Sequence, residues 1–379
     1  MTGPKSGGKD MKKILIISNI PSPYRTALFS YLQKSQKKYR FQVLYTGRRE
    51  ADRVWTTQEE IDDTFFMDAR VLSVKGGEIG GTATRFIHIP RGLGRILKKL
   101  SPDVIIGSEY NLSAVQAFLW AKGRHIPYIN LTDGTLRSET YIGTTQKLTR
   151  KLIISGSTAF LASSTKAKEK LLAWGAAENK IALSYLTVPT AEYLKLERQK
   201  EPGRILFVGR ISHEKGLDLL VKALAKTKEP CRLRVVGNDV GGEQAQVEAL
   251  VRELGLTGRV KFLGYREGEA LLEEYRKCAF LAVPSRSDCF GLVMVEAACA
   301  GVPIAASIYA DGAYDLITPG KNGHLADPED TDAFAGMLDK MLENPLDAEK
   351  TREVLGEKFS FQNAVQGYLR AVEIAEGER

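Results

Sequence analysis

The stretch AFLAVPSRSDCFGLVMVEAACAG, from Ala279 to Gly301, runs from a short apolar segment through a polar loop into a segment of small residues. Its first part, Ala279–Val283, predicts a buried strand, and Phe290–Ala300 predicts the helix that follows it. Asp288 and Glu296 stand eight positions apart. On an unbroken helix they would lie about 12 Å apart, which is too far for both to bind one metal ion. We therefore expect the two carboxylates to hold the two ends of an elongated ligand.

The same order of strand, loop and helix recurs on both sides of this stretch. Short, wholly apolar strands that alternate with helices predict parallel sheets covered on both faces, which is the α/β class. The predicted strands are 13–18, 103–107, 127–131, 159–162, 204–208, 232–236 and 260–263, and the predicted helices are 26–33, 112–122, 165–174, 215–225 and 243–254.

The length of 379 residues predicts two domains, because a single hydrophobic core stops growing below this size. The polar segment EYLKLERQKEPG, residues 192–203, ends in Pro-Gly and is the best candidate for a linker. We expect one Rossmann-like domain over residues 1–195, a second over 196–360, and a helix over 361–379 that packs back on the first. Ligands are expected in the cleft between the domains, at the carboxyl ends of the strands.

The composition is that of a soluble globular protein, with 43% hydrophobic and 26% charged residues. No apolar run reaches the roughly eighteen residues of a membrane span, and residues 1–10 lack the apolar segment of a signal peptide. The four cysteines form no CxxC pair, which fits a reducing, cytoplasmic compartment. The four histidines show no metal-ligand spacing, so we expect no metal site.

Charge is unevenly divided along the chain. Residues 1–200 hold 32 Lys and Arg against 17 Asp and Glu, whereas residues 201–379 hold 22 against 29. The basic half predicts contact with something anionic, either a membrane surface or a charged acceptor. Two solvated surfaces of unlike composition are the alternative.

One basic segment of the first half has helical periodicity. In RGLGRILKKL, Arg91–Leu100, the side chains of Leu93, Ile96, Leu97 and Leu100 fall on one face. A surface helix that rests on anionic lipid would show this pattern. A helix that turns its apolar face to the core would show it too, and both interpretations stay open.

A second loop carries charges suited to phosphate. In FVGRISHEKGLDLL, Phe207–Leu220, an apolar strand ends at Gly209, and Arg210 and Lys215 flank the loop that opens a helix. Glycine lets the backbone approach a ligand, a helix N-terminus offers unpaired N–H groups, and two cations would neutralise a phosphate. The GxxxxGK[ST] pattern of a P-loop is absent. Solvated cations at a surface loop are the alternative.

Several linked motifs of the second half resemble one family. The segment DCFGLVMVEA, Asp288–Ala297, resembles the E-x7-E region of the retaining glycosyltransferases of family 4 (glycosyl transferases group 1), which have the GT-B fold. That family's order and spacing are also matched by Gly209-Arg210, Lys215-Gly216, 260–265 and 283–285. The resemblance is strong over residues 203–326 and looser before them. It implies two Rossmann-like domains whose parallel sheets face a central cleft.

The resemblance implies that these positions bind a nucleotide-sugar donor. Arg210 and Lys215 would hold its diphosphate. Glu296 would accept hydrogen bonds from the ribose, and Asp288 would do so from hydroxyls of the transferred sugar. An ordinary helix carboxylate at Glu296 and a helix N-cap at Asp288 are the alternatives.

The resemblance also implies contacts made by the backbone. The turn at Phe290, Gly291 and Leu292 would present N–H groups near the sugar and phosphate. Gly264 and Tyr265 would lie where the family's loop receives the base.

The chain departs from the family's pattern at two places near the donor. The first acidic position is usually glutamate, and the shorter Asp288 stands there, which bears on the identity of the sugar. Many members have a glycine pair after the first strand, where this chain has Pro21–Arg25. In this loop Ser22 and Arg25 are candidates for phosphate contact, with Arg25 as the added cation. A helix cap or a surface ion pair is the alternative for Arg25.

A further departure concerns Asp133 in YINLTDGT, which follows the predicted strand 127–131 and so faces the cleft. Many relatives have a histidine at this turn, near the transferred sugar. Asp133 is expected to accept a hydroxyl hydrogen bond and to stabilise positive charge at the anomeric carbon. A plain Asp-Gly turn with Gly134 is the alternative.

The sequence therefore predicts a retaining, metal-independent glycosyltransferase without a separate cofactor, in which Asp133, Asp288, Arg210 and Lys215 carry the chemistry. The segments NIPSPYRTALFSYL and SEYNLSAVQAFLW resemble bacterial polysaccharide-assembly transferases, which implies a glycan or lipid-linked acceptor, a cytoplasmic location and contact with the inner membrane face. Nucleic acid is not expected as a partner. A nucleotide-sugar sensor without catalysis and a GT-B sugar-nucleotide epimerase are the alternatives.

Overall fold

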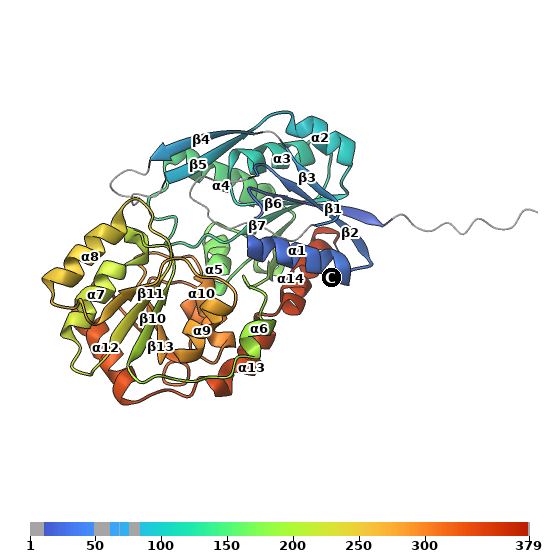
Figure 1. Cartoon of the computed structure of the whole chain (residues 1–379). Helices are drawn as coiled ribbons and strands as arrows, with labels where there is room; N and C mark the ends of the chain where they lie inside the picture. Colours follow the sequence, from blue (N-terminus) through green and yellow to red (C-terminus); the bar gives the residue numbers. More distant parts are fainter. Residues whose placement is uncertain (1–10, 49–60, 68, 76–83, 378–379) are drawn as a thin grey trace, which may run out of the picture.

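The computed structural model describes residues 11–48, 61–67, 69–75 and 84–377, which form two α/β domains (Figure 1). The sheet of the first domain is wholly parallel. Across the sheet, its seven strands follow the order β3 (Thr64–Phe66), β2 (Tyr39–Tyr45), β1 (Lys12–Ser18), β6 (Val104–Ser108), β7 (Tyr128–Thr132), β8 (Ala159–Ala162) and β9 (Ile181–Leu183).

The sheet of the second domain is also parallel. Its six strands follow the order β12 (Val260–Phe262), β11 (Arg232–Val236), β10 (Arg204–Val208), β13 (Phe280–Val283), β14 (Ile304–Ser307) and β15 (Gly323–Ala326). Buried side chains form one cluster on each face of each sheet. The predicted α/β class with two parallel sheets is therefore confirmed.

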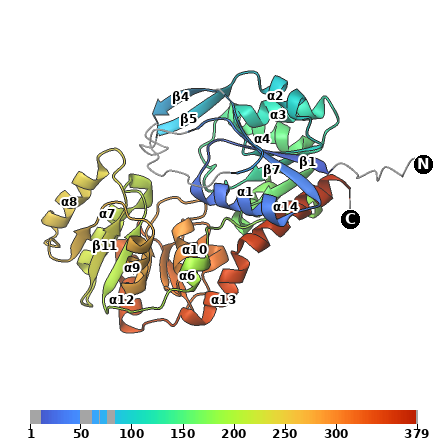
Figure 2. The same cartoon turned by 45° about the vertical axis from the view of Figure 1, so that its right-hand side comes forward.

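Helices cover both faces of the two sheets (Figure 2). In the first domain they are α1 (Pro23–Ser35), α2 (Leu93–Leu100), α3 (Leu112–Lys122), α4 (Thr144–Gly156), α5 (Thr165–Ala173) and the 3-10 turn η1 (Glu178–Lys180). Between the sheets and in the second domain they are α6 (Ala191–Leu194), η2 (His213–Lys215), α7 (Leu217–Lys226), α8 (Glu243–Glu253), α9 (Glu269–Lys277), α10 (Leu292–Cys299), α11 (Ala313–Leu316), α12 (Thr331–Glu343) and α13 (Glu349–Lys358). No helix in the described part of the chain is both long and apolar enough to span a bilayer.

The last helix, α14 (Phe361–Ala375), belongs to the core of the first domain although it follows the second. It lies beside α1 in both views (Figures 1 and 2). The ring of Tyr368 meets the ring of Phe29 edge-on with centroids 6.2 Å apart. The buried face of α14 therefore packs on the first sheet over β7, β8 and β9.

Each sheet has a topological switch point, where strands that neighbour in space diverge in the chain order. In the first sheet it lies between β1 and β6, and in the second between β10 and β13. The loops after such strands open a crevice at their carboxyl ends, where ligands of α/β proteins bind. Arg25 lies in the first turn of α1, the helix that follows β1, whereas Lys215 ends the 3-10 turn after β10 and Asp288 lies in the loop after β13.

The apolar face of α2 packs into the first domain. Leu93, Leu97 and Leu100 are 2%, 0% and 8% exposed, and Ile96 packs against the same core cluster. The core-facing interpretation of this segment is therefore correct, and its leucines cannot meet lipid. The structure also contains an antiparallel hairpin, β4 (Ala69–Lys75) with β5 (Thr84–Pro90), that the sequence patterns did not predict.

Candidate active site between the two sheets

A cleft of about 440 Å³ lies between the two domains. Its lining from the first domain includes Tyr24 in the first turn of α1 and Asp133 directly after β7. Its lining from the second domain comes mainly from the loops after β10 and β13, with Gly209, Lys215, Ser285, Asp288, Cys289, Phe290, Gly291 and Leu292. The two predicted motifs of the second half thus lie together, and Asp133 shares their cleft.

Lys215 and Asp288 form an ion pair in this cleft, with 2.5 Å between Nζ and Oδ2. The other oxygen of Asp288 accepts a hydrogen bond from the N–H of Phe290 at 3.2 Å. Asp288 is not the N-cap of α10, because Gly291 takes that position with φ 78°. A left-handed residue ends the loop there, so the helix begins at Leu292, two residues later than predicted.

The loops that carry these two charges press on each other. Gly216, between Lys215 and α7, has φ 66°, and a Cβ atom at this position would lie 2.1 Å from the carbonyl oxygen of Pro284. Only glycine fits both the backbone conformation and the space. Arg210 is half-buried after Gly209 and lies outside the cleft lining.

Glu296 lies in the middle of α10, outside the cleft lining. The hydroxyl of Tyr275 donates to its Oε2 at 2.7 Å. Burial raises the pKa of Glu296 to about 7, although bonds from Tyr275 and Tyr193 act in the opposite direction. The Glu296 carboxyl thus titrates in the neutral range.

The predicted base loop has a left-handed start and an exposed aromatic ring. Gly264 has φ 69°, and Tyr265 is 49% exposed with its hydroxyl donating to Glu267 at 2.9 Å. Burial raises the pKa of Tyr265 to about 12, and the charges of Glu267 and Glu296 add to this effect.

In the first domain, Arg25 forms an ion pair with Asp133, and their side chains are 9% and 26% exposed. Burial opposes the charge of Arg25, but Asp133 outweighs it and holds the pKa of Arg25 well above its ordinary value. Asp133 Oδ1 is buried and has no hydrogen-bond partner among the described residues. The side chain of Ser22 makes no cap bond to α1. The guanidinium of Arg25 therefore pairs with the carboxylate of Asp133. Contact of Ser22 and Arg25 with a phosphate stays a prediction.

A residue that the sequence patterns did not single out, Glu109, holds the turn of Asp133. It follows β6 with φ 60°, a conformation that costs energy for a residue other than glycine. Its carboxylate accepts hydrogen bonds from the N–H groups of Asp133 at 2.6 Å and Gly134 at 3.3 Å, and from the hydroxyl of Thr132 at 3.0 Å. The available signal was a carboxylate directly after a buried strand, but the left-handed backbone has no signature in the sequence.

The two domains also meet directly beside the cleft. The hydroxyl of Thr135 donates to Asp311 Oδ2 at 2.5 Å, and the N–H of Asp311 donates to the carbonyl oxygen of Asp288 at 2.9 Å. The turn that carries Asp133 and the loop that carries Asp288 are thus linked through Asp311. Among the described residues, no group of three or more His, Cys, Asp or Glu side chains is placed to hold a metal ion.

Residues 192–359 match the family described as glycosyl transferases group 1. The match covers less than half of the chain, and over these residues the chain is similar to this glycosyltransferase family. The D-inositol 3-phosphate glycosyltransferase of Acidothermus cellulolyticus is 32% identical over 46% of this chain and 42% of that protein. An uncharacterised glycosyltransferase of Methanocaldococcus jannaschii is 29% identical over 47% of this chain and 46% of that protein. These matches span less than half the length of either relative.

Solved structures resemble nearly the whole chain. The crystal structure of Anabaena HepE in complex with UDP and glucose has a TM-score of 0.71 at 18% identity, over 96% of this chain and 99% of that one. The apo form of the lipopolysaccharide outer core galactosyltransferase WaaB has a TM-score of 0.71 at 21% identity, over 95% and 99%. These neighbours are GT-B glycosyltransferases, and the implied GT-B fold is confirmed.

Proposed function

We propose that the protein is a retaining glycosyltransferase of family 4 that moves a sugar from a UDP- or GDP-sugar to a glycan or lipid-linked acceptor. One observation carries the proposal: Lys215 pairs with Asp288 at the carboxyl ends of β10 and β13, in the same cleft as Asp133 of the first sheet. The relation to HepE, whose structures hold UDP or UDP-glucose, supports a nucleotide sugar as the donor.

In this proposal the donor enters between the Lys215 and Asp288 side chains. The diphosphate replaces Asp288 as the partner of Lys215, and Arg210 and the N–H groups near Gly291 also bind it. The Asp288 carboxylate then accepts a hydrogen bond from a hydroxyl of the sugar. Glu296 accepts the ribose hydroxyls. Lys215 already lines the cleft, so its charge stabilises the departing diphosphate in the transition state.

Transfer then breaks the bond between the anomeric carbon and the diphosphate oxygen, and the bonding electrons leave with the diphosphate. The acceptor hydroxyl attacks from the same face, so the configuration is retained. Its proton passes to the departing phosphate oxygen. Asp133, whose Oδ1 is unpartnered among the described residues, lies across the cleft and stabilises the positive charge at the anomeric carbon.

The acceptor belongs to the first domain, whose basic surplus suits a phosphate-bearing or otherwise anionic molecule. A growing glycan or a lipid-linked sugar fits this charge, in polysaccharide or cell-envelope glycan synthesis at the inner membrane face. Because side-chain cations stabilise the diphosphate, no metal is required, and transfer should continue in EDTA.

Nucleotide binding tests the donor site. Arg210→Ala and Lys215→Ala should each weaken binding of UDP or GDP by about ten- to a hundredfold, because a charge-assisted hydrogen bond contributes about 1.5–3 kcal/mol. Lys222→Ala is the matched control, since Lys222 lies on α7 with a side chain 46% exposed. Calorimetric titration measures all three. Wild-type affinity in both donor-site variants would contradict the proposal.

A further inference from the structure

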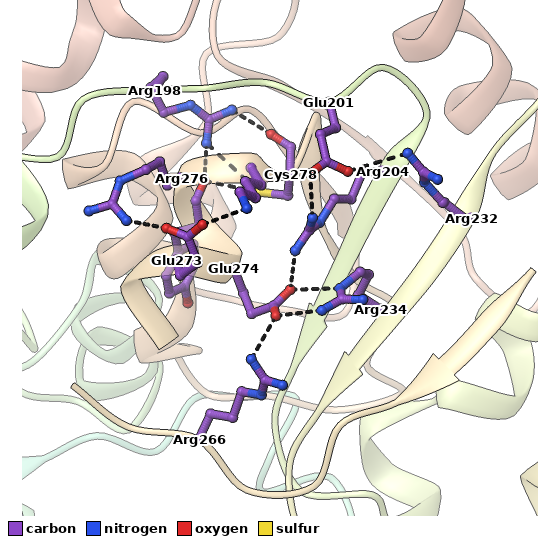
Figure 3. A network of polar contacts seen from close by, with 12 residues as sticks. Arg198, Glu201, Arg204, Arg232, Arg234, Arg266, Glu273, Glu274, Arg276 and Cys278 are labelled. Carbon is purple, nitrogen blue, oxygen red and sulfur yellow. Dashed lines mark hydrogen bonds and ion pairs between the residues drawn. The ribbon is translucent and has the colours of Figure 1, made fainter. Parts of the chain in front are cut away.

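A buried carboxylate in the second domain gathers three arginines (Figure 3). Glu274 lies on α9 with a side chain 2% exposed. Arg234 of β11 binds both of its oxygens in a fork, at 2.7 and 2.8 Å. Arg204 of β10 donates to Oε2 at 2.7 Å, and Arg266 donates to Oε1 at 2.9 Å. Each carboxylate oxygen therefore accepts two hydrogen bonds from guanidinium groups.

The charges of this cluster keep Glu274 ionised. Burial opposes its charge, but the hydrogen bonds and charges of Arg234 and Arg204 outweigh burial and lower the pKa of Glu274. Glu201 shares the excess positive charge by pairing with Arg204 at 2.8 Å. A buried, ionised carboxylate is a strong anchor for any arginine that reaches it.

The three arginines come from different kinds of structure. Two of them lie on strands of the sheet, whereas Arg266 lies in the loop 264–268 that joins β12 to α9. Both ends of this loop are glycines with positive φ, Gly264 at 69° and Gly268 at 54°. Glu274 thus connects the rigid sheet to a loop with permissive ends.

Few other contacts hold this loop. The N–H of Gly237 donates to the carbonyl oxygen of Gly264 at 3.0 Å, and Tyr265 bonds to Glu267 within the loop. The described residues provide no hydrogen-bond partner for the main-chain N–H and C=O groups of Tyr265 and Arg266. These groups are open to a ligand, and the bond of Arg266 to Glu274 fixes the direction in which they point.

Helix α9 also reaches the ribose side of the proposed donor site. Tyr275, the residue after Glu274, donates its hydroxyl to Glu296 at 2.7 Å. One helix therefore orients both the loop 264–268 and the carboxylate proposed for the ribose.

We propose that Glu274 and Arg266 are positioning residues that hold the loop 264–268 in the shape that recognises the nucleobase. The inference rests on the proposed function and adds to it the residues that determine base selectivity. A loop held in its binding shape loses less conformational entropy when the ligand binds, and it presents its N–H and C=O groups in one pattern. One fixed pattern favours one base over the others.

The test compares Arg266→Met with Arg276→Met. Arg276 is also an arginine of this region, but its side chain pairs with Glu269 and Glu273 on its own helix. Calorimetry gives Kd values of each protein for UDP, GDP and ADP, and thermal unfolding shows that each variant is folded. Arg266→Met should weaken the best-bound nucleotide at least fivefold and the other two less, so that discrimination among bases shrinks. Arg276→Met should keep both affinity and discrimination.

A conservative variant separates positioning from charge. Arg266→Lys keeps a charged donor for Glu274 and should recover part of the lost discrimination. Equal weakening of all three nucleotides by Arg266→Met, or no weakening, would overturn the inference alone. A wild-type protein that bound none of the three nucleotides would overturn the proposed function and the inference with it.

Discussion

Among single residues, Asp133 has two carboxylate oxygens in different surroundings. One oxygen pairs with Arg25, and the other is buried without a partner among the described residues. The carboxylate of Glu109 holds the backbone of the turn by accepting a hydrogen bond from the N–H of Asp133. Asp133 lines the cleft in which, in the proposed reaction, positive charge develops on the sugar.

Asp133→Asn should fold normally and bind nucleoside diphosphate as wild type does, but lose at least about tenfold in transfer rate, a barrier change of about 1.4 kcal/mol. The amide keeps the shape and removes the charge. Asp103→Asn is the control, because Asp103 is an exposed carboxylate that accepts the N–H of Lys13 at 2.8 Å. Turnover close to wild type with a confirmed acceptor would make Asp133 a plain turn residue.

Glu296 should make donor binding depend on pH. Its pKa of about 7 means that about half of the carboxyl groups are neutral at that pH. If ribose hydroxyls bind the ionised form, affinity rises with pH through 7 and is about tenfold weaker at pH 6 than at pH 8. A nucleotide sugar is the right probe, since the terminal phosphate of a free diphosphate titrates near pH 6 itself. Glu296→Gln should remove the dependence, and an unchanged profile would contradict the assignment.

Among the elements, the two loops of the proposed donor site depend on backbone conformations that few residues other than glycine adopt. The left-handed Gly216 lets η2 turn into α7 while the chain touches Pro284. Gly291 is also left-handed and joins the Asp288 loop to α10. The two glycines therefore let the two loops approach closely enough for Lys215 and Asp288 to form their ion pair.

Gly216→Ala should lower the free energy of unfolding by at least about 1–2 kcal/mol and weaken nucleotide binding, because both the backbone and the contact with Pro284 become strained. Gly336→Ala is the contrast. Gly336 lies inside α12. Apart from its two chain neighbours and the backbone of its own helix, no described residue has an atom within 4 Å of the position that an alanine methyl group would occupy. Alanine should therefore stabilise this helix by about 0.5–1 kcal/mol. Denaturant unfolding measures both, and effects of the same sign would contradict the argument.

For the whole molecule, the proposed reaction needs groups from both domains. The contacts that join the domains include the bond from Thr135 to Asp311 and a second set at Asp315, which accepts bonds from the N–H and hydroxyl of Thr165 at 2.9 and 2.8 Å. In the proposed function, in contrast, the nucleotide is bound by residues of the second domain. Loosening the domain contact should therefore affect transfer and spare nucleotide binding.

Thr165→Val tests this separation. It removes the hydroxyl bond to Asp315, and transfer should fall about two- to tenfold while the Kd for nucleoside diphosphate stays unchanged. Thr149→Val is the control, because the Thr149 hydroxyl bonds to Gln146 of its own helix at 2.9 Å. Rate and affinity assays decide the outcome; a parallel loss of both would show that the contact is not specific to transfer.

Local sequence patterns predicted the α/β class with two parallel sheets and many of their strands and helices, but not the strands β2, β3, β9, β14 and β15. Apolar runs and helical periodicity are local patterns, and a glycine such as Gly216 signals a local backbone shape. The same local logic placed Asp133 at the end of a strand. It could not decide which way α2 faces, because a lipid-facing helix and a core-facing helix have the same periodicity.

Which charges meet, in contrast, depends on the packing of the whole chain. Arg25 and Asp133 are 108 positions apart, Thr135 and Asp311 are 176, and Arg204 and Glu274 are 70. Such partners are selected by which strand ends lie side by side and which helix covers them, and neither residue type nor periodicity records that choice. The roles of Glu109 and Glu274 therefore became visible only when packing had brought their partners together, since each acts through groups contributed by other elements of the fold.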